Sequence, residues 1–96
     1  MMNEDKPRKR HYCLAVCKRS DWYNRCHGIK VKFEYIHYTA LSHDEALEYG
    51  KRYSVEHEGM VVCVSQRGGR SSIPGNKFAW TSLCRFYNGR NHTTRY

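Results

Sequence analysis

The stretch that decides the fold is SHDEALEYGKRYSVEHEG, residues 42–59. Ser42 is a typical N-cap, and Glu45 three residues later completes a capping box that satisfies backbone amides at the start of a helix. Gly50 interrupts the apolar stripe of the pattern, where a missing side chain lets a helix approach a sheet closely. The final glycine is a natural helix stop. The pattern therefore predicts one amphipathic helix that ends at Glu58.

Short apolar runs flank this helix on both sides and predict strands. Before it, strands are expected over residues 11–18 and 29–38; after it, over residues 60–65 and 77–87. The first strand is apolar on both faces, so we expect it to lie in the middle of a sheet. In the second strand apolar and charged residues alternate, but the phase changes after Tyr35, which predicts a bulge or the strand end there.

Two polar segments between these elements are predicted to be turns or loops. Residues 19–28 form a polar turn, and residues 67–76 contain Gly-Gly and Pro-Gly pairs. The element order β-β-α-β-β predicts an α+β domain, in which one helix packs on one face of a four-stranded, mostly antiparallel sheet. We expect this domain over residues 11–88, between a flexible basic arm (1–10) and a polar basic tail (89–96).

Positive charge is concentrated in the C-terminal part of the chain. The formal net charge is +8, and the last acidic residue is Glu58. The basic residues that follow it are Arg67, Arg70, Lys77, Arg85, Arg90 and Arg95. A second basic cluster is Lys6, Arg8, Lys9 and Arg10. Such a field attracts nucleic acid or an anionic protein surface.

The sequence carries no membrane or export signal. No run approaches the ~20 apolar residues of a membrane span, and the charged first ten residues lack the apolar segment of a signal peptide. We therefore expect a cytoplasmic protein that does not bind membranes, with its five cysteines reduced.

One group of residues raises the question of a zinc site. Cys13, Cys17, Cys26 and His27 are close in sequence. However, four residues along a strand span roughly 13 Å, too far for two thiolates on one tetrahedral ion. Zinc binding therefore requires the strand prediction over residues 11–18 to be wrong, and on that condition it stays open.

Catalytic motifs are absent from the sequence. There is no Gly-x-Ser-x-Gly, His-Glu-x-x-His or Walker motif, and the adjacent Cys26 and His27 do not suit a nucleophile and its base. We expect a binding protein without a cofactor rather than an enzyme.

The candidate binding residues fall in three places: the long loop, an aromatic pair in the first polar turn, and the basic C-terminal strand and tail. They are Trp22, Tyr23, Arg67, Arg70, Ser72, Ile73, Pro74, Lys77, Arg85, Arg90 and Arg95. The loop cations, serine hydroxyls and backbone amides suit phosphate contacts, or the Ile-Pro-Gly turn suits a groove on a partner protein. Aromatic residues interleaved with arginine can stack on bases or anchor a protein interface.

By its size, its charge and the loop Ser71-Ser72-Ile73-Pro74-Gly75, the chain resembles the anti-RecBCD accessory proteins of lambdoid phages. The resemblance implies binding to the RecC subunit of a host recombination nuclease, modulation or inhibition of that complex, and a place in the host cytoplasm. It also implies that a prolyl isomerase engages Pro74. An anti-CRISPR or other anti-defence protein would share these features. A second function stays open from the residues themselves: direct binding of DNA or RNA through the C-terminal basic surface.

Overall fold

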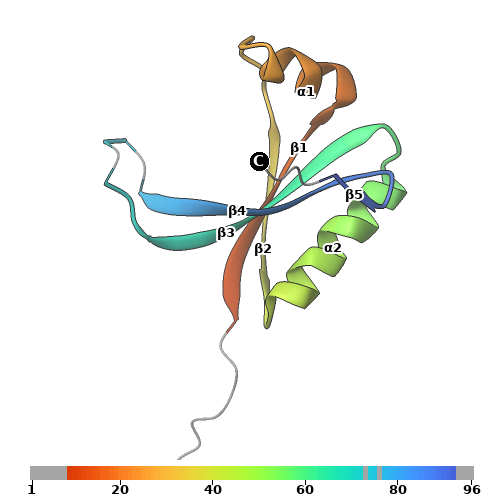
Figure 1. Cartoon of the computed structure of the whole chain (residues 1–96). Helices are drawn as coiled ribbons and strands as arrows, with labels where there is room; N and C mark the ends of the chain where they lie inside the picture. Colours follow the sequence, from red (N-terminus) through yellow and green to blue (C-terminus); the bar gives the residue numbers. More distant parts are fainter. Residues whose placement is uncertain (1–8, 73, 76, 93–96) are drawn as a thin grey trace, which may run out of the picture.

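The computed structural model describes residues 9–72, 74–75 and 77–92. The elements in chain order are β1 (Arg10–Lys18), α1 (Arg19–Cys26), β2 (Glu34–Ala40), α2 (His43–Glu56), β3 (Met60–Arg70), β4 (Phe78–Tyr87) and β5 (Arg90–Asn91). The strands form one antiparallel sheet in the order β2-β1-β3-β4-β5 (Figure 1). The predicted α+β class and antiparallel sheet are confirmed. The described chain also has a fifth strand and a second helix.

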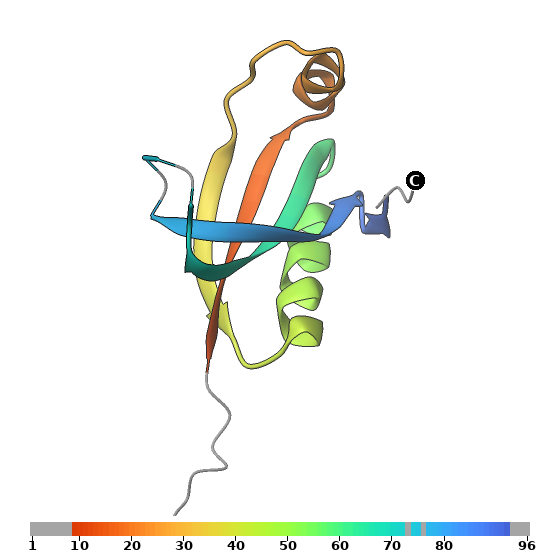
Figure 2. The ribbon, with the colours of Figure 1, turned by 60° about the vertical axis from the view of Figure 1, so that its left-hand side comes forward.

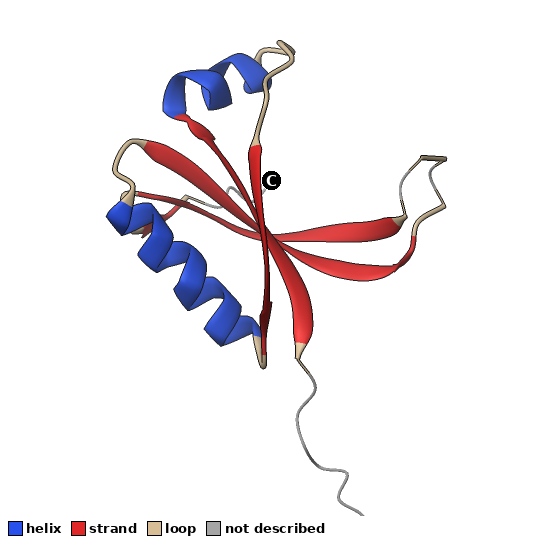
Figure 3. Ribbon diagram, turned by 180° about the vertical axis from the view of Figure 1, so that it is seen from behind, coloured by secondary structure: helices blue, strands red, loops and turns tan. Residues whose placement is uncertain are grey.

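The sheet is built around β1, which pairs with β2 on one side and with β3 on the other. Its predicted internal position is therefore confirmed. Because both neighbours run antiparallel to β1, β2 and β3 run parallel to each other, and α2 makes the connection between them. Helix α2 lies along one face of the sheet (Figure 2). The loop end of the β3–β4 hairpin extends away from that helix (Figure 3).

Helix α2 begins as its capping pattern predicts. The Ser42 Oγ accepts a hydrogen bond of 3.1 Å from the backbone amide of Glu45. Gly50 is buried against β3: a Cβ atom built there would lie 2.4 Å from Cγ2 of Val64. The expected close approach of helix and sheet at Gly50 is confirmed.

The core lies between α2 and the sheet. Its buried members include Tyr12, Leu14, Val16, Ala40, Ala46, Val62, Val64 and Phe86. Each large apolar side chain removed from water contributes about 1.5–3 kcal/mol, so these few residues supply most of the apolar burial. The hydroxyl of Tyr38 donates a 2.9 Å hydrogen bond to the carbonyl oxygen of Ala46 at the edge of this core. Burial raises the pKa of Tyr38, which keeps the hydroxyl neutral and able to donate.

The strand predicted over residues 29–38 begins later in the chain than expected, and the other set of alternating side chains faces the core. Strand β2 begins at Glu34, in register with Val16 of β1. The side chains that pack on the core are Ile36 and Tyr38, whereas Tyr35 is 61% exposed. The change of phase in the sequence marked the true inward face. The earlier alternating residues belong to the connection from α1 and are not paired.

The prediction of a polar turn over residues 19–28 is also wrong, because α1 occupies most of it. This helix buries none of its residues and has no side-chain cap, so neither an apolar stripe nor a capping motif marks it in the sequence. Asp21 in its first turn and Arg25 in its last turn both suit the helix dipole. No helix in the described part of the chain has the length and apolar character needed to cross a membrane.

The loop predicted over residues 67–76 is shorter than expected. Strand β3 continues through Gly68 and Gly69 to Arg70, which lies in register with Phe78. The glycines fit because Gly68 lies against the backbone of β4: an added Cβ would be 3.3 Å from the carbonyl oxygen of Ala79. The hairpin connection therefore begins only after Arg70.

The sheet also continues into the segment expected to be a polar tail. Asn88 and Gly89 both have positive φ angles, 50° and 81°. One common class of tight two-residue turn that joins paired strands requires positive φ angles at both residues. The turn brings Arg90 and Asn91 back as β5, where they pair with the end of β4.

Candidate functional site

The face of the sheet opposite α2, which we call the open face, gathers the candidate binding groups. Its side chains follow from the alternation of each strand and from the register. They are His11, Cys13, Ala15 and Cys17 of β1; Tyr35, His37 and Thr39 of β2; Val61, Cys63, Ser65 and Arg67 of β3; and Trp80, Ser82, Arg85 and Tyr87 of β4. The central strands β1 and β3 carry mostly small residues on this face, and the strands on either side of them, β2 and β4, carry most of the large ones.

One group of side chains on the open face, the hairpin cluster, consists of His37, Arg67, Lys77, Phe78 and Trp80. The guanidinium carbon of Arg67 lies 4.2 Å from the ring centroid of Phe78, and the Lys77 Nζ lies 5.5 Å from the same centroid. The rings of His37 and Trp80 are 5.7 Å apart between centroids. Trp80 is nevertheless 41% exposed, so part of its ring is accessible.

The His37–Trp80 contact crosses two intervening strands. Strands β2 and β4 are three strand spacings apart, roughly 14 Å in a flat sheet. Between them, in the same row as His37, lie Cys13 of β1 and Ser65 of β3. Because these two residues are small, and because sheets twist, the rings can lean over them and meet. The same arrangement leaves Cys13 only 5% exposed.

A second group, the α1 cluster, consists of Trp22, Arg25, Phe33 and Arg85. The indole of Trp22 lies 4.8 Å from the guanidinium carbon of Arg85 and 5.3 Å from that of Arg25. Phe33 is 6.4 Å from Trp22 between ring centroids and 5.6 Å from the guanidinium carbon of Arg25. Two cations and two aromatic rings therefore alternate at the α1 end of the open face.

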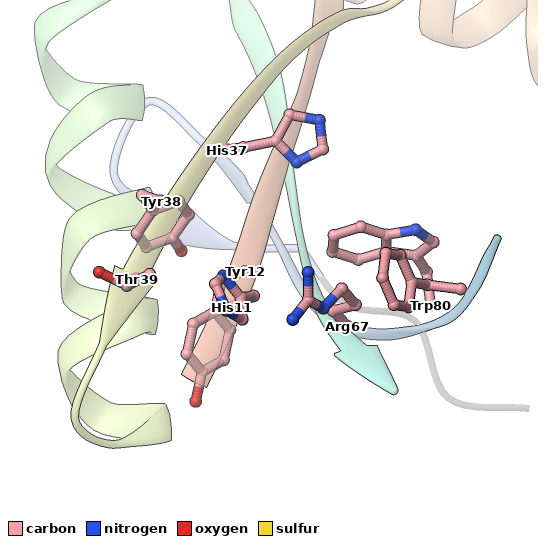
Figure 4. A pocket seen from close by; sticks show the side chains of 8 residues that line it. His11, Tyr12, His37, Tyr38, Thr39, Arg67 and Trp80 are labelled. Carbon is pink, nitrogen blue, oxygen red and sulfur yellow. The ribbon is translucent and has the colours of Figure 1, made fainter. Parts of the chain in front are cut away.

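A cavity of about 360 Å³ lies beside the hairpin cluster (Figure 4). His11, Thr39, Arg67 and Trp80 line it; His11 is paired with Thr39, and Arg67 with Trp80. Figure 4 shows the side chains of Arg67, His37 and Trp80 converging on this space from three different strands. The cavity thus combines a permanent cation, exposed ring surface and polar groups.

Most carboxylates of the described residues lie on the α2 side of the sheet, where α2 also carries Lys51 and Arg52. Helix α2 carries Asp44, Glu45, Glu48 and Glu56. Glu34 is the one acidic residue in the described strands, and its register with Val16 places it on the α2 side. The strand positions of the open face carry arginine and histidine but no carboxylate. An anion that approaches the hairpin end of the open face therefore meets cations and no strand carboxylate, whereas Asp21 of α1 lies near Cys17 at the other end.

The thiols of the open face are kept in their neutral form. Burial raises the pKa of Cys13 and of Cys17, and it raises that of Cys63 to about 11, although the nearby Arg85 acts in the opposite direction. A thiol is a nucleophile only as the thiolate. These three side chains therefore act here as small, uncharged surface.

The structure brings together only some of the residues proposed from the sequence. Trp22 and Arg85 are in contact, and Arg67 and Lys77 share the ring of Phe78. The others lie apart from these clusters or outside the described ranges. Arg70, Ser72 and Pro74 are exposed at the loop end of the β3–β4 hairpin, and Arg90 is exposed on β5. Tyr23 is 63% exposed, and its ring makes a tilted contact with His27 at 4.2 Å between centroids. Ile73 and Arg95 lie outside the described residues.

Five members of the two clusters are not among the candidate binding residues chosen from the sequence: Arg25, Phe33, His37, Phe78 and Trp80. His37 could have been found from the correct phase of β2, because it alternates with the core residues Ile36 and Tyr38. No local signal marks Phe33, since its partner Trp22 lies on a helix that the sequence did not predict.

The residues considered for zinc lie on different elements. Cys13 and Cys17 are in β1, as predicted, and Cys26 is the last residue of α1. Within the described ranges, no three His, Cys, Asp or Glu side chains are grouped closely enough to hold a metal ion.

Comparisons with protein-family models, with curated proteins and with solved structures found no match to this chain.

Proposed function

We propose that this protein binds nucleic acid through the open face of its sheet. The observation that carries the proposal is the alternation of arginine with aromatic rings on a face whose strand positions hold no carboxylate. Phosphate groups supply most of the affinity of such contacts, because the protein's cations release the counterions that surround the polymer.

The cation–ring contacts give the arginines a defined role. In the hairpin cluster the guanidinium of Arg67 is 4.2 Å from the Phe78 ring, and in the α1 cluster Arg85 is 4.8 Å from Trp22. A guanidinium held against a ring loses fewer rotamers on binding, while its planar set of donors suits phosphate oxygens. The two clusters lie at different positions along β3–β4 and can contact phosphates several nucleotides apart on one polymer.

Salt dependence of binding tests the proposal. Fluorescence anisotropy of a labelled oligonucleotide, measured between 50 and 200 mM salt, should show affinity falling by an order of magnitude or more. Arg67→Ala should weaken binding. It should also make the plot of log affinity against log salt less steep, by the amount that one phosphate contact contributes to the slope. The matched control is Arg52→Ala, which removes the same charge from α2 and should change the slope less. Absence of binding to single-stranded and duplex DNA and RNA at low salt would refute the proposal.

Binding of a host nuclease complex, with modulation of its activity, is a second proposal. Tyr23 and Ile29 favour it: they are 63% and 54% exposed and lie in and just after α1. Exposed aromatic and aliphatic side chains of this kind anchor protein interfaces. Pro74, exposed in the hairpin connection, is the group that a prolyl isomerase would engage in this proposal.

Capture from a nuclease-treated bacterial lysate separates the two proposals. Recovery of recombination-nuclease subunits that is lost in Tyr23→Ala, with nucleic-acid binding unchanged, would support the protein partner. Equal recovery by the wild type and by Tyr23→Ala would show that the exposed Tyr23 side chain does not anchor the partner. Treating the lysate with nuclease ensures that shared nucleic acid does not carry the captured subunits.

A further inference from the structure

The cavity beside the hairpin cluster has the size and chemistry of a ligand site. Its volume of about 360 Å³ falls in the range of about 300–1,000 Å³ that is typical of small-molecule sites. Ring surface comes from Trp80 and Phe78, and polar groups come from His11, His37 and Thr39. Arg67 supplies the positive charge at the same place.

The ring surfaces suit a flat aromatic ligand. Trp80 is 41% exposed, and its contact with His37 is tilted at 55°, so His37 does not cover the indole face to face. The guanidinium of Arg67 is itself a plane that stacks on aromatic groups. A nucleobase has a π face that stacks on such surfaces and an edge of donors and acceptors for neighbouring polar side chains.

We propose that this cavity takes one unpaired nucleobase, stacked on Trp80, with the adjoining phosphate on Arg67. The inference rests on the proposed nucleic-acid function and narrows it to single strands. A base inside a duplex is paired and stacked on its neighbours, so its face cannot reach the indole unless the duplex opens, which costs a few kcal/mol.

The distance between the hairpin cluster and the α1 cluster sets the length of nucleic acid that can contact both. In β3, the partners of Arg85 and Trp80 are Cys63 and Arg67, four residues apart. Four residues span roughly 13 Å along a strand. At about 3.4 Å per stacked nucleotide, that distance corresponds to about four nucleotides. A strand of eight nucleotides is therefore long enough to contact both clusters.

The test follows the side chain of Trp80 itself. The chain has two tryptophans, so a ¹H–¹⁵N spectrum shows two indole signals, and Trp80→Phe identifies the one from Trp80. The probes are an eight-residue oligothymidine, an abasic oligonucleotide with the same number of phosphates, and an eight-base-pair duplex. We expect the Trp80 signal to shift with oligothymidine and to move little with the other two.

Affinities separate this inference from the function on which it rests. Trp80→Ala should lower the affinity for oligothymidine by about 5- to 100-fold, the effect of one lost stacking contact, and leave that for the abasic oligonucleotide nearly unchanged. Equal Trp80 shifts with the abasic oligonucleotide or with the duplex would overturn the base site while phosphate binding stands. If none of the three probes binds at low salt, and single-stranded and duplex RNA do not bind either, the nucleic-acid function fails with it.

Discussion

Replacing Gly50 by alanine measures how closely α2 is held against the sheet. The new Cβ would lie 2.4 Å from Cγ2 of Val64 and 3.4 Å from Cδ2 of Leu14. Carbon atoms in favourable contact are about 3.5–4.0 Å apart, so helix and strand must separate by about 1 Å. Val64 is fully buried on a strand paired on both sides, and its branched side chain has few alternative rotamers.

The magnitude follows from two opposing terms. Overpacking of a core costs about 1–3 kcal/mol, and so short a distance to a fixed methyl group places this site in the upper half of that range. Alanine in place of glycine in a helix contributes about 1 kcal/mol in the other direction. We therefore expect a net loss of about 1–2 kcal/mol in the free energy of unfolding. This corresponds to a fall in Tm of roughly 5–15 °C for a chain of this size.

Urea unfolding followed by circular dichroism measures this loss, with Gly69→Ala as the matched control. A Cβ atom built on Gly69 would have no neighbouring heavy atom within 4 Å, so this replacement should cost little. A double-mutant cycle adds a sharper test. Val64→Ala removes the methyl group that the new Cβ would meet, so Gly50→Ala combined with Val64→Ala should cost less than the sum of the two single changes. An unchanged or raised urea midpoint for Gly50→Ala would refute the close packing.

Four further predictions concern single side chains. The hydroxyl of Tyr12 is buried and makes no hydrogen bond to a described residue, so Tyr12→Phe should leave Tm unchanged or raise it in a thermal melt. Exposed Cys26 should react with a thiol reagent at pH 8 long before Cys63, whose pKa of about 11 leaves little thiolate. The raised pKa of Cys63 also makes the free energy of unfolding depend on pH: its contribution is present below about pH 9 and is lost as the pH rises toward 11. Cys63→Ala should therefore flatten that part of a plot of the free energy of unfolding against pH. Pro74→Ala should shift Tm little, since Pro74 is exposed in the hairpin connection. It should weaken partner binding if the loop contacts the partner. A large fall in Tm with unchanged affinity would show that the loop has a structural role.

The parts of the fold that were predicted correctly carry their signals locally. Ser42 and Glu45 mark the start of α2 within four residues, and the apolar character of both faces of β1 places it inside the sheet. Where prediction failed, the deciding contact lies far away in the chain. Gly68 and Gly69 indicate a turn by themselves, yet β3 continues through them at an irregularity between Arg67 and Arg70, which are both paired with β4. A helix without a buried residue, such as α1, has no periodic pattern to detect.

The candidate site was predictable as a set of residue types but not as an arrangement. Arg67 and Arg85 could be chosen because they lie in a segment without acidic residues. That Arg67 rests on Phe78, and Arg85 on Trp22, depends on the order and register of strands. Register is a long-range property, and a shift by one residue would move every side chain of a strand to the other face.

The small residues of the open face explain why a cavity can form on a sheet that has no helix over its hairpin end. Cys13 and Ser65 follow His37 in its row across β1 and β3, and Trp80, which is paired with Arg67, reaches His37 from the next row on that face. Bulky side chains at these two positions would fill the space over which the rings lean, and the rings would then stand apart in solvent. Cysteine suits position 13 because its side chain is small, its thiol lies 3.5 Å from the carbonyl oxygen of Leu14, and burial keeps it neutral. Thiols of this kind therefore contribute by their size to the shape of the proposed base site, and their chemistry is not required there.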